Sequence, residues 1–115
     1  MFTGKNEIQF KDWYNNKYLK DKKGFVRLTL ELFYELPPEM QLGVYLAYAD
    51  SLGYEIEKSR YFDEEMNVTN SYEVAIMDYT RKNICLDVFY NENEIAAYKE
   101  AFKKFDEIVN NQLKD

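Results

Sequence analysis

The side chains of this sequence that could act as acids or bases are mainly carboxylates, because none of its 115 residues is histidine, the commonest general base and metal ligand. Asp78 and Asp87 fall in neighbouring expected strands, and Asp63, Glu64 and Glu65 are consecutive. Paired carboxylates can transfer protons or hold a divalent cation. Neither group has the spacing of a known metal loop, and the triplet lacks the glycine that an EF-hand requires. We therefore interpret them as solvated charges and expect no metal or cofactor.

Nucleophilic catalysis would require a nucleophile beside a base, and the single cysteine, Cys85, is one candidate. Cys85 lies in an apolar segment with strand character, where a thiol is usually inert core. Gly43 and Gly53 are isolated, so the sequence contains no phosphate-binding or dinucleotide-binding loop. We therefore predict that the protein is not an enzyme. A single cysteine also excludes an internal disulfide and favours the reducing cytoplasm.

The net charge of −6, from 21 acidic and 15 basic residues, argues against direct binding to nucleic acid. Recognition of the phosphate backbone requires a surplus of Lys and Arg. No segment approaches the roughly 18 consecutive apolar residues of a membrane span. The first residues also lack the apolar core of a signal peptide. These features predict a cytoplasmic protein without a membrane partner.

Helical periodicity places the first element at about residues 5–20, with Thr3 as a candidate N-cap. Residues 22–24 are expected to break this helix. The next segment, residues 25–36, is ambiguous, because its apolar residues alternate as in a strand while its charged residues recur every four positions as in a helix. Leu and Glu are good helix formers, so a helix ending before Pro37 is favoured.

A further helix is predicted to start at Pro38, which suits the first turn because its missing N–H is not needed there. Its body spans residues 40–52, and Gly53 serves as the C-terminal stop. Gly43 lies inside this helix at a cost of about 1 kcal/mol relative to alanine. Such an interior glycine predicts the close approach of another element.

From Tyr54 the pattern changes to that of strands. A first strand of mixed polarity is followed by a loop at residues 63–67, and two segments rich in β-branched and aromatic residues, 72–79 and 84–90, form a hairpin. If Tyr79 pairs with Ile84, both faces of this hairpin are largely apolar. A half-exposed antiparallel sheet should alternate instead. Either helices cover both faces, or one face meets another chain.

The last helix begins at a cap formed by Asn91 or Asn93, and Asn91 with Glu94 resembles a capping box. Its apolar residues form a heptad-like seam, for which packing against the sheet is favoured over a dimer helix. The elements together predict a single α+β domain over residues 1–115. We expect an antiparallel two- or three-stranded sheet packed by N-terminal helices and one long C-terminal helix.

The sequence is rich in aromatic residues, with 11 tyrosines, eight phenylalanines and one tryptophan. The phenylalanines and the tryptophan suit core positions, whereas tyrosine is amphipathic and enriched at protein interfaces. We predict that some tyrosines form an exposed contact patch. The candidate contact residues are Tyr45, Tyr48, Tyr54 and Tyr61, with Asp63, Glu64 and Glu65. The alternative is that a low-G+C coding sequence inflates the tyrosine content.

The stretch LPPEMQLGVY at residues 36–45, continuing to DSLG at residues 50–53, resembles a segment of small uncharacterised proteins of phages and mobile elements of gut bacteria. The similar segment contains a helix with its stop and no catalytic residue. The resemblance implies a genomic setting in which small acidic proteins often bind and block host machinery.

These features predict a non-catalytic protein-binding module, whose partner is a host protein or a second copy that would form a homodimer. An inhibitor of a host defence or nucleic-acid-handling complex is the specific form that the resemblance implies. A small self-associating structural or assembly protein is one alternative. An acidic mimic of nucleic acid is another, and it ranks lower because 15 basic residues are interspersed among the acids.

Overall fold

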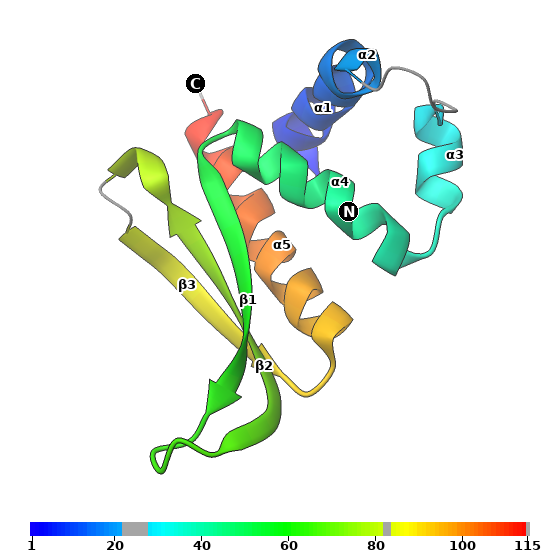
Figure 1. Ribbon diagram of the computed structural model, residues 1–115. Helices are drawn as coiled ribbons and strands as arrows, with labels where there is room; N and C mark the ends of the chain where they lie inside the picture. Colours follow the sequence, from blue (N-terminus) through cyan, green and yellow to red (C-terminus); the bar gives the residue numbers. More distant parts are fainter. Residues whose placement is uncertain (22–27, 82–83, 115) are drawn as a thin grey trace.

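The computed structural model describes residues 1–21, 28–81 and 84–114, which form an α+β fold (Figure 1). A three-stranded antiparallel sheet is packed by helices, and a long C-terminal helix lies across one face, so the predicted fold class is confirmed. The elements are α1 (Gly4–Trp13), the π-helical segment η1 (Tyr14–Tyr18), α2 (Leu19–Asp21), α3 (Leu30–Glu35), α4 (Pro38–Ser51), β1 (Tyr54–Phe62), β2 (Val68–Asp78), the 3-10 turn η2 (Tyr79–Arg81), β3 (Ile84–Asn91) and α5 (Glu94–Gln112).

The predicted first helix is present as the continuous run of α1, η1 and α2, which begins at Gly4. Thr3 has the extended backbone of an N-cap, but its hydroxyl donates to the Asp106 carboxylate at 2.6 Å and caps no helical N–H. Thr3 is therefore the N-cap residue of α1, as predicted, but its side chain makes no capping bond, because a carboxylate from the last helix supplies a charge-assisted bond instead. The break predicted at residues 22–24 lies outside the described residues.

The ambiguous segment is helical over residues 30–35, where the Thr29 hydroxyl caps α3 by accepting from the Leu32 N–H at 3.3 Å. The favoured helix is confirmed there, whereas residues 25–27 lie outside the part of the chain that the structure describes. The start of α4 at Pro38 and the stop at Gly53, which has a φ of +88°, are also as predicted.

Gly43 does not mark the close approach of another element. It is exposed on α4, and a Cβ at this position would meet no other atom within 4 Å. The prediction of tight packing at Gly43 is therefore wrong, because this side of α4 faces open space.

The strands lie in the order β1-β2-β3, and each is antiparallel to its neighbour. Ile84 pairs with Asp78 rather than with Tyr79, so the predicted register is wrong by one residue next to the turn, whereas from the pair Ile76 and Asp87 onward it is as predicted. The cause is that Tyr79 has already left the strand to begin the turn η2. Residues 82 and 83 of the predicted hairpin loop are not among those described.

A β-bulge in β3 changes which side chains share a face. Cys85 pairs with Met77 and Asp87 pairs with Ile76, so that Leu86 is an extra residue between them. Such a residue inverts the alternation of the strand. Leu86 therefore packs against the core and Cys85 is exposed, whereas strict alternation from a pairing of Tyr79 with Ile84 would place Cys85 on the same face as Val74 and Ile76. The prediction that Cys85 is a buried core thiol is wrong for the same reason.

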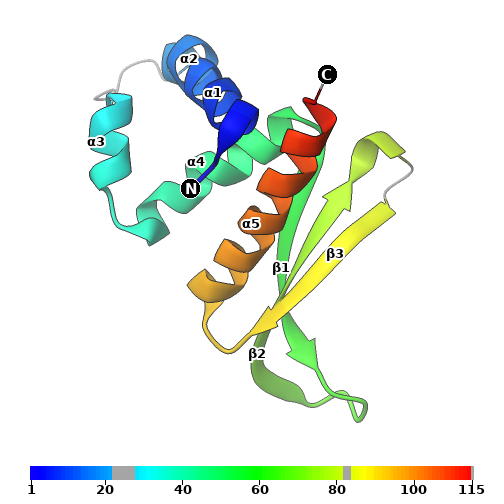
Figure 2. The same ribbon diagram turned by 180° about the vertical axis from the view of Figure 1, so that it is seen from behind.

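Helices cover one face of the sheet, here called the inner face, and no helix of the described residues covers the outer face (Figures 1 and 2). Val74 and Ile76 of β2 are fully buried on the inner face beneath α5. Of the two arrangements predicted for an apolar hairpin, cover by helices on both faces is therefore excluded. No helix in the described part of the chain has the length and apolar character needed to cross a membrane.

The side of α5 away from solvent holds the apolar seam that the sequence predicted. Tyr98, Phe102, Phe105 and Val109 are buried against the sheet and the N-terminal helices, so the packing interpretation is confirmed. Aromatic rings from the first helical run, α3, α4 and the N-terminal segment join this core: Phe2, Phe10, Tyr14, Phe33, Tyr45 and Tyr48. Edge-to-face pairs at about 5 Å, typical of stable ring contacts, are frequent among them.

The N-cap of α5 is Asn93, whose side chain accepts from the Ala96 N–H at 2.9 Å. The side chain of Asn91 accepts instead from the Asn93 N–H at 2.8 Å. The capping box predicted for Asn91 and Glu94 is therefore absent, because Asn91 still belongs to β3.

Candidate functional site

Three of the tyrosines predicted to contact a partner lie in the core. Tyr45, Tyr48 and Tyr54 are each at most 4% exposed. The hydroxyl of Tyr45 donates to Gln41 at 2.8 Å and that of Tyr48 donates to the side-chain oxygen of Asn6. The expectation that these rings form an exposed patch is wrong, because the fold supplies internal partners for their hydroxyls.

Burial also changes the acidity of these rings. Loss of solvation of the charged form raises the pKa of Tyr48 to about 12 and raises the pKa of Tyr45 as well. Both side chains are therefore neutral donors under ordinary conditions, which suits a structural role.

The other predicted contact residues gather where β1 turns into β2. Tyr61 is exposed at the end of β1, and Glu64 and Glu65 are exposed in the turn. The Asp63 carboxylate accepts from the Glu65 and Asn67 N–H groups, at 3.0 and 2.9 Å, and so holds the turn itself. The structure thus brings these four residues together and separates them from the three buried tyrosines.

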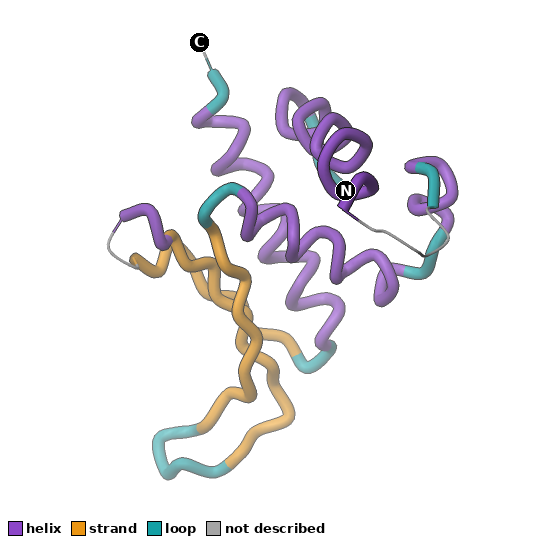
Figure 3. The backbone as a smooth tube through the Cα atoms, turned by 45° about the horizontal axis from the view of Figure 1, so that its top comes forward, coloured by secondary structure: helices purple, strands orange, loops and turns teal. Residues whose placement is uncertain are grey.

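This end of the sheet carries exposed apolar residues that the sequence reasoning missed. Phe62 and Val68 pair across the two strands, and Met66 lies in the turn between them. Their exposed fractions are 46%, 62% and 74%. The β1–β2 hairpin extends past the end of α5, so nothing in the described chain covers them (Figure 3). We call residues 62–68 the hairpin tip.

Met66 adopts a left-handed backbone conformation, with a φ of +64°. This conformation costs an ordinary L-residue roughly 1–2 kcal/mol, and glycine or asparagine usually occupies it. The turn is closed by bonds from the Met66 N–H to the Asp63 carbonyl and from the Asp63 N–H to the Asn67 carbonyl, both 3.0 Å. A large apolar side chain is thus held in a strained position where it contributes nothing to the core.

The outer face of the sheet next to the hairpin tip combines carboxylates with tyrosines. Its members are Glu55, Glu57, Ser59 and Tyr61 of β1, Ser71, Glu73, Ala75 and Met77 of β2, Cys85, Val88 and Tyr90 of β3, and Tyr79. Among these described positions there is no lysine or arginine. The cations of β1 belong to the inner face, where Lys58 pairs with Glu94 at 2.9 Å and Arg60 stacks on Tyr72.

A hollow of 300 Å³ lies at the hairpin end of the outer face. It is lined by Tyr61, Ser71 and Tyr90, one from each strand. The rings of Tyr61 and Tyr90 meet edge to face, with centroids 5.1 Å apart and an interplanar angle of 73°. Burial and the nearby negative charge of Glu73 raise the pKa of Tyr90.

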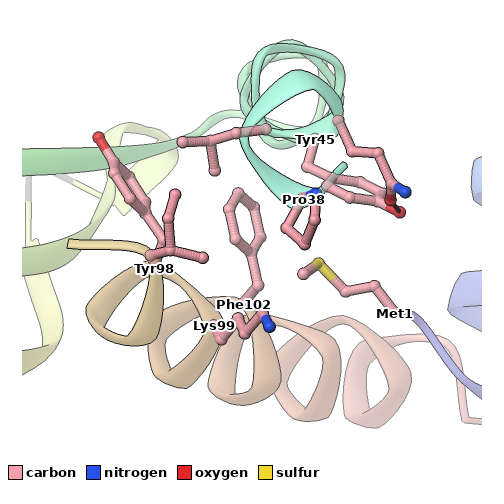
Figure 4. A pocket seen from close by; sticks show the side chains of 9 residues that line it. Met1, Pro38, Tyr45, Tyr98, Lys99 and Phe102 are labelled. Atoms are coloured by element: carbon pink, nitrogen blue, oxygen red, sulfur yellow. Dashed lines mark hydrogen bonds between the residues drawn. The ribbon is translucent and has the colours of Figure 1, made fainter. Parts of the chain in front are cut away.

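A second pocket, of 330 Å³, lies between α4, α5 and the N-terminal residue (Figure 4). Its walls are mainly apolar, with Tyr98 and Phe102 from α5 facing Pro38 and Tyr45 from α4. The figure shows no cluster of reactive side chains in it. The pocket is therefore a mainly apolar cavity, with Lys99 as the one charged side chain among its described lining residues.

The side chains considered for catalysis have local structural roles. Asp78 is buried and accepts from the N–H and hydroxyl of Thr80, at 2.9 and 2.6 Å, so it stabilises the turn η2. Asp87 accepts from the N–H of Val88 at 2.9 Å. Within the described ranges, no group of three or more His, Cys, Asp or Glu residues could hold a metal ion.

Comparison with known proteins gives no assignment, since no protein-family model matches the chain and no curated protein or solved structure is significantly similar to it. The geometry alone thus defines the candidate functional site. It is the hairpin tip, with its exposed apolar side chains, together with the adjoining outer face.

Proposed function

We propose that the protein is a non-catalytic protein-binding module that contacts its partner through the hairpin tip. The observation that carries this proposal is the exposure of Phe62, Met66 and Val68 on a hairpin that extends past the helical layer. Full burial of such a side chain contributes about 1.5–3 kcal/mol. Three of them at one protruding end suit the apolar centre of a small interface, with Glu64 and Glu65 at its polar rim.

The backbone of Met66 supports this proposal. Conformations that cost free energy persist most often where they serve recognition or catalysis. A glycine would relieve the left-handed strain, yet the turn holds a methionine that is 74% exposed. Methionine is flexible and polarisable, so it adapts well to the surface of a partner.

Self-association through the outer face is the first alternative, and the charges of that face oppose it. Glu55, Glu57 and Glu73 would meet the same residues of a second copy, with no described cation on the face to compensate. Like charges brought together at an interface are destabilising.

Nucleic-acid mimicry is the second alternative. It would require carboxylates arrayed like phosphates, whereas on the outer face they alternate with tyrosines. That the partner belongs to a host defence or nucleic-acid-handling complex stays a prediction.

Site-specific photo-crosslinking tests the proposal. A photoreactive amino acid replaces Met66 in one variant and Met40, which is 62% exposed on α4, in a matched control. Both proteins are irradiated in a lysate of the source cells, and crosslinked products are identified by mass spectrometry. We expect a defined heterologous crosslink from position 66 that is absent from position 40, because only the hairpin tip is proposed to lie in the interface.

Polar replacement gives the corresponding loss-of-binding test. Met66→Gln should lower recovery of that crosslinked protein in a pull-down about tenfold, whereas Met40→Gln should not. Crosslinks from position 66 to a second copy of the chain would favour the self-association alternative. Equal crosslinking from the two positions would contradict the proposed contact.

A further inference from the structure

We propose that the hollow formed by Tyr61, Ser71 and Tyr90 receives an arginine side chain of the protein partner, with Glu73 beside it as the counter-ion. This inference rests on the proposed function, because the hollow adjoins the hairpin tip through Tyr61. It assigns a chemical class to the part of the partner that lies over the outer face, namely a segment bearing arginine.

The first support is the shape of the hollow. Two tyrosine rings in edge-to-face contact form part of its wall, and its volume of 300 Å³ is ample for a guanidinium group with part of its stem. A cation within about 6 Å of an aromatic centroid is attracted by the negative face of the ring. Arginine exploits such a site better than lysine, because its planar group stacks on a ring and is more weakly hydrated.

The second support is charge. Glu73 lies beside Tyr90 on the outer face, since it pairs with Tyr90 of β3 on one side and, on the other, with Ser59 of β1, two residues before Tyr61. No ion pair joins Glu73 to any lysine or arginine in residues 1–21, 28–81 and 84–114. A guanidinium group in the hollow would supply the missing cation and can bond a carboxylate with two parallel N–H groups.

The third support is that the same sheet already makes this kind of contact on its inner face. The guanidinium carbon of Arg60 lies 4.3 Å from the centroid of the Tyr72 ring, and the two residues pair directly across β1 and β2. The outer-face positions that the structure describes include tyrosines but no arginine. The geometry therefore points to a cation supplied by another molecule.

Nuclear magnetic resonance titration with short peptides tests this inference. The probes are N-acetyl-Gly-Arg-Gly-amide and its lysine counterpart, added to the isotopically labelled protein up to about 10 mM, a range that covers weak single-residue affinity. We expect saturable shifts of the Tyr61, Ser71 and Tyr90 amides with the arginine peptide. The dissociation constant of the lysine peptide should be higher by at least about fivefold.

Three variants show whether the hollow is responsible. Tyr90→Leu and Glu73→Gln should each weaken arginine-peptide binding by at least about fivefold, since each removes one part of the recognition. Tyr34→Leu is the control for Tyr90→Leu, because Tyr34 is also an exposed tyrosine, at 39% against 52% for Tyr90, but lies on α3. Thermal unfolding of each variant confirms that the fold is retained.

Equal affinities for the two peptides, shifts confined to other residues, or no saturation would each overturn the arginine assignment. Concentration-dependent self-association that Arg81→Ala abolishes would also overturn it, by making a second copy the source of the guanidinium. These outcomes are distinct from failure of the proposed function. If position 66 crosslinks a partner and the arginine peptide does not bind, the hairpin-tip contact stands and only this inference fails.

Discussion

Asp106 is the residue at which the two ends of the chain are joined. Its carboxylate accepts from the Thr3 N–H at 3.1 Å, the Thr3 hydroxyl at 2.6 Å, the Asn6 amide at 2.8 Å and the Asn110 amide at 3.2 Å. The group is almost fully buried, so these bonds replace its hydration. A single carboxylate thereby fixes the start of α1 against the C-terminal half of α5.

Asp106→Asn should lower the free energy of unfolding by about 2–3 kcal/mol. The donors from Thr3, Asn6 and Asn110 would then bond a neutral acceptor instead of a charged one, and the new NH₂ group at position 106 would face one of these donors. Urea denaturation measures the change. The matched control is Glu100→Gln, an exposed residue of the same helix, which should stay within about 0.5 kcal/mol of the parent protein. A similar midpoint for both variants would show that the Asp106 network contributes little.

At this scale the sequence indicated only part of the candidate site. The acidic triplet and Tyr61 were identified because loop acids and strand-end tyrosines are visible locally. Tyr45, Tyr48 and Tyr54 were misassigned, since the partners of Tyr48 and Tyr54, Asn6 and Gln112, come from segments remote in sequence. Periodicity carries no information about such distant hydrogen bonds.

The β1–β2 hairpin is the element on which the proposed function depends, and its turn can be tested without the partner. Met66→Gly should raise the free energy of unfolding by about 0.5–1 kcal/mol, because relief of left-handed strain exceeds the entropy that glycine loses. Met40→Gly, inside α4, should instead lower it by about 1 kcal/mol. Urea denaturation distinguishes the two. Destabilisation by Met66→Gly would show that the Met66 side chain packs within the fold.

The positions of the helices and strands were largely predictable from the sequence. Which side chains of β3 point to which face of the sheet was less predictable. Pro38, Gly53 and the apolar spacing of residues 95–109 mark α4 and α5 by local chemistry. The bulge at Leu86 has no such mark, because no glycine or proline interrupts β3. Only the pairing with β2 reveals it, and so the exposure of Cys85 could not be predicted.

At the scale of the whole molecule, buried tyrosines make the fold sensitive to alkaline pH. The folded-state pKa of Tyr48 is raised to about 12, above its unfolded value near 10, so the folded state retains a proton that the unfolded chain loses. The stabilisation is therefore complete below pH 10 and is lost as the pH rises towards 12. Each such tyrosine should lower the free energy of unfolding by about 1.4 kcal/mol per pH unit in this window.

Urea denaturation at neutral pH and at about pH 11 measures this slope. The control is Tyr48→Phe, which removes one titrating group and should give a shallower decline with pH, whatever its stability at neutral pH. Ultraviolet absorbance of tyrosinate should rise together with unfolding. An unchanged slope in Tyr48→Phe would contradict the role assigned to this ring.

The joining of Thr3 and Asn6 to Asp106 and Asn110 also constrains how the protein is made. The N-terminal helix is synthesised about 100 residues before the carboxylate that holds it, so its bonds to Asp106 cannot form until that part of α5 has been made. Contacts of such high sequence separation form late, because the chain must first close a long loop. The contacts that join the two ends of the chain therefore form only after the last helix emerges, and a nascent chain without α5 should remain a client for chaperones.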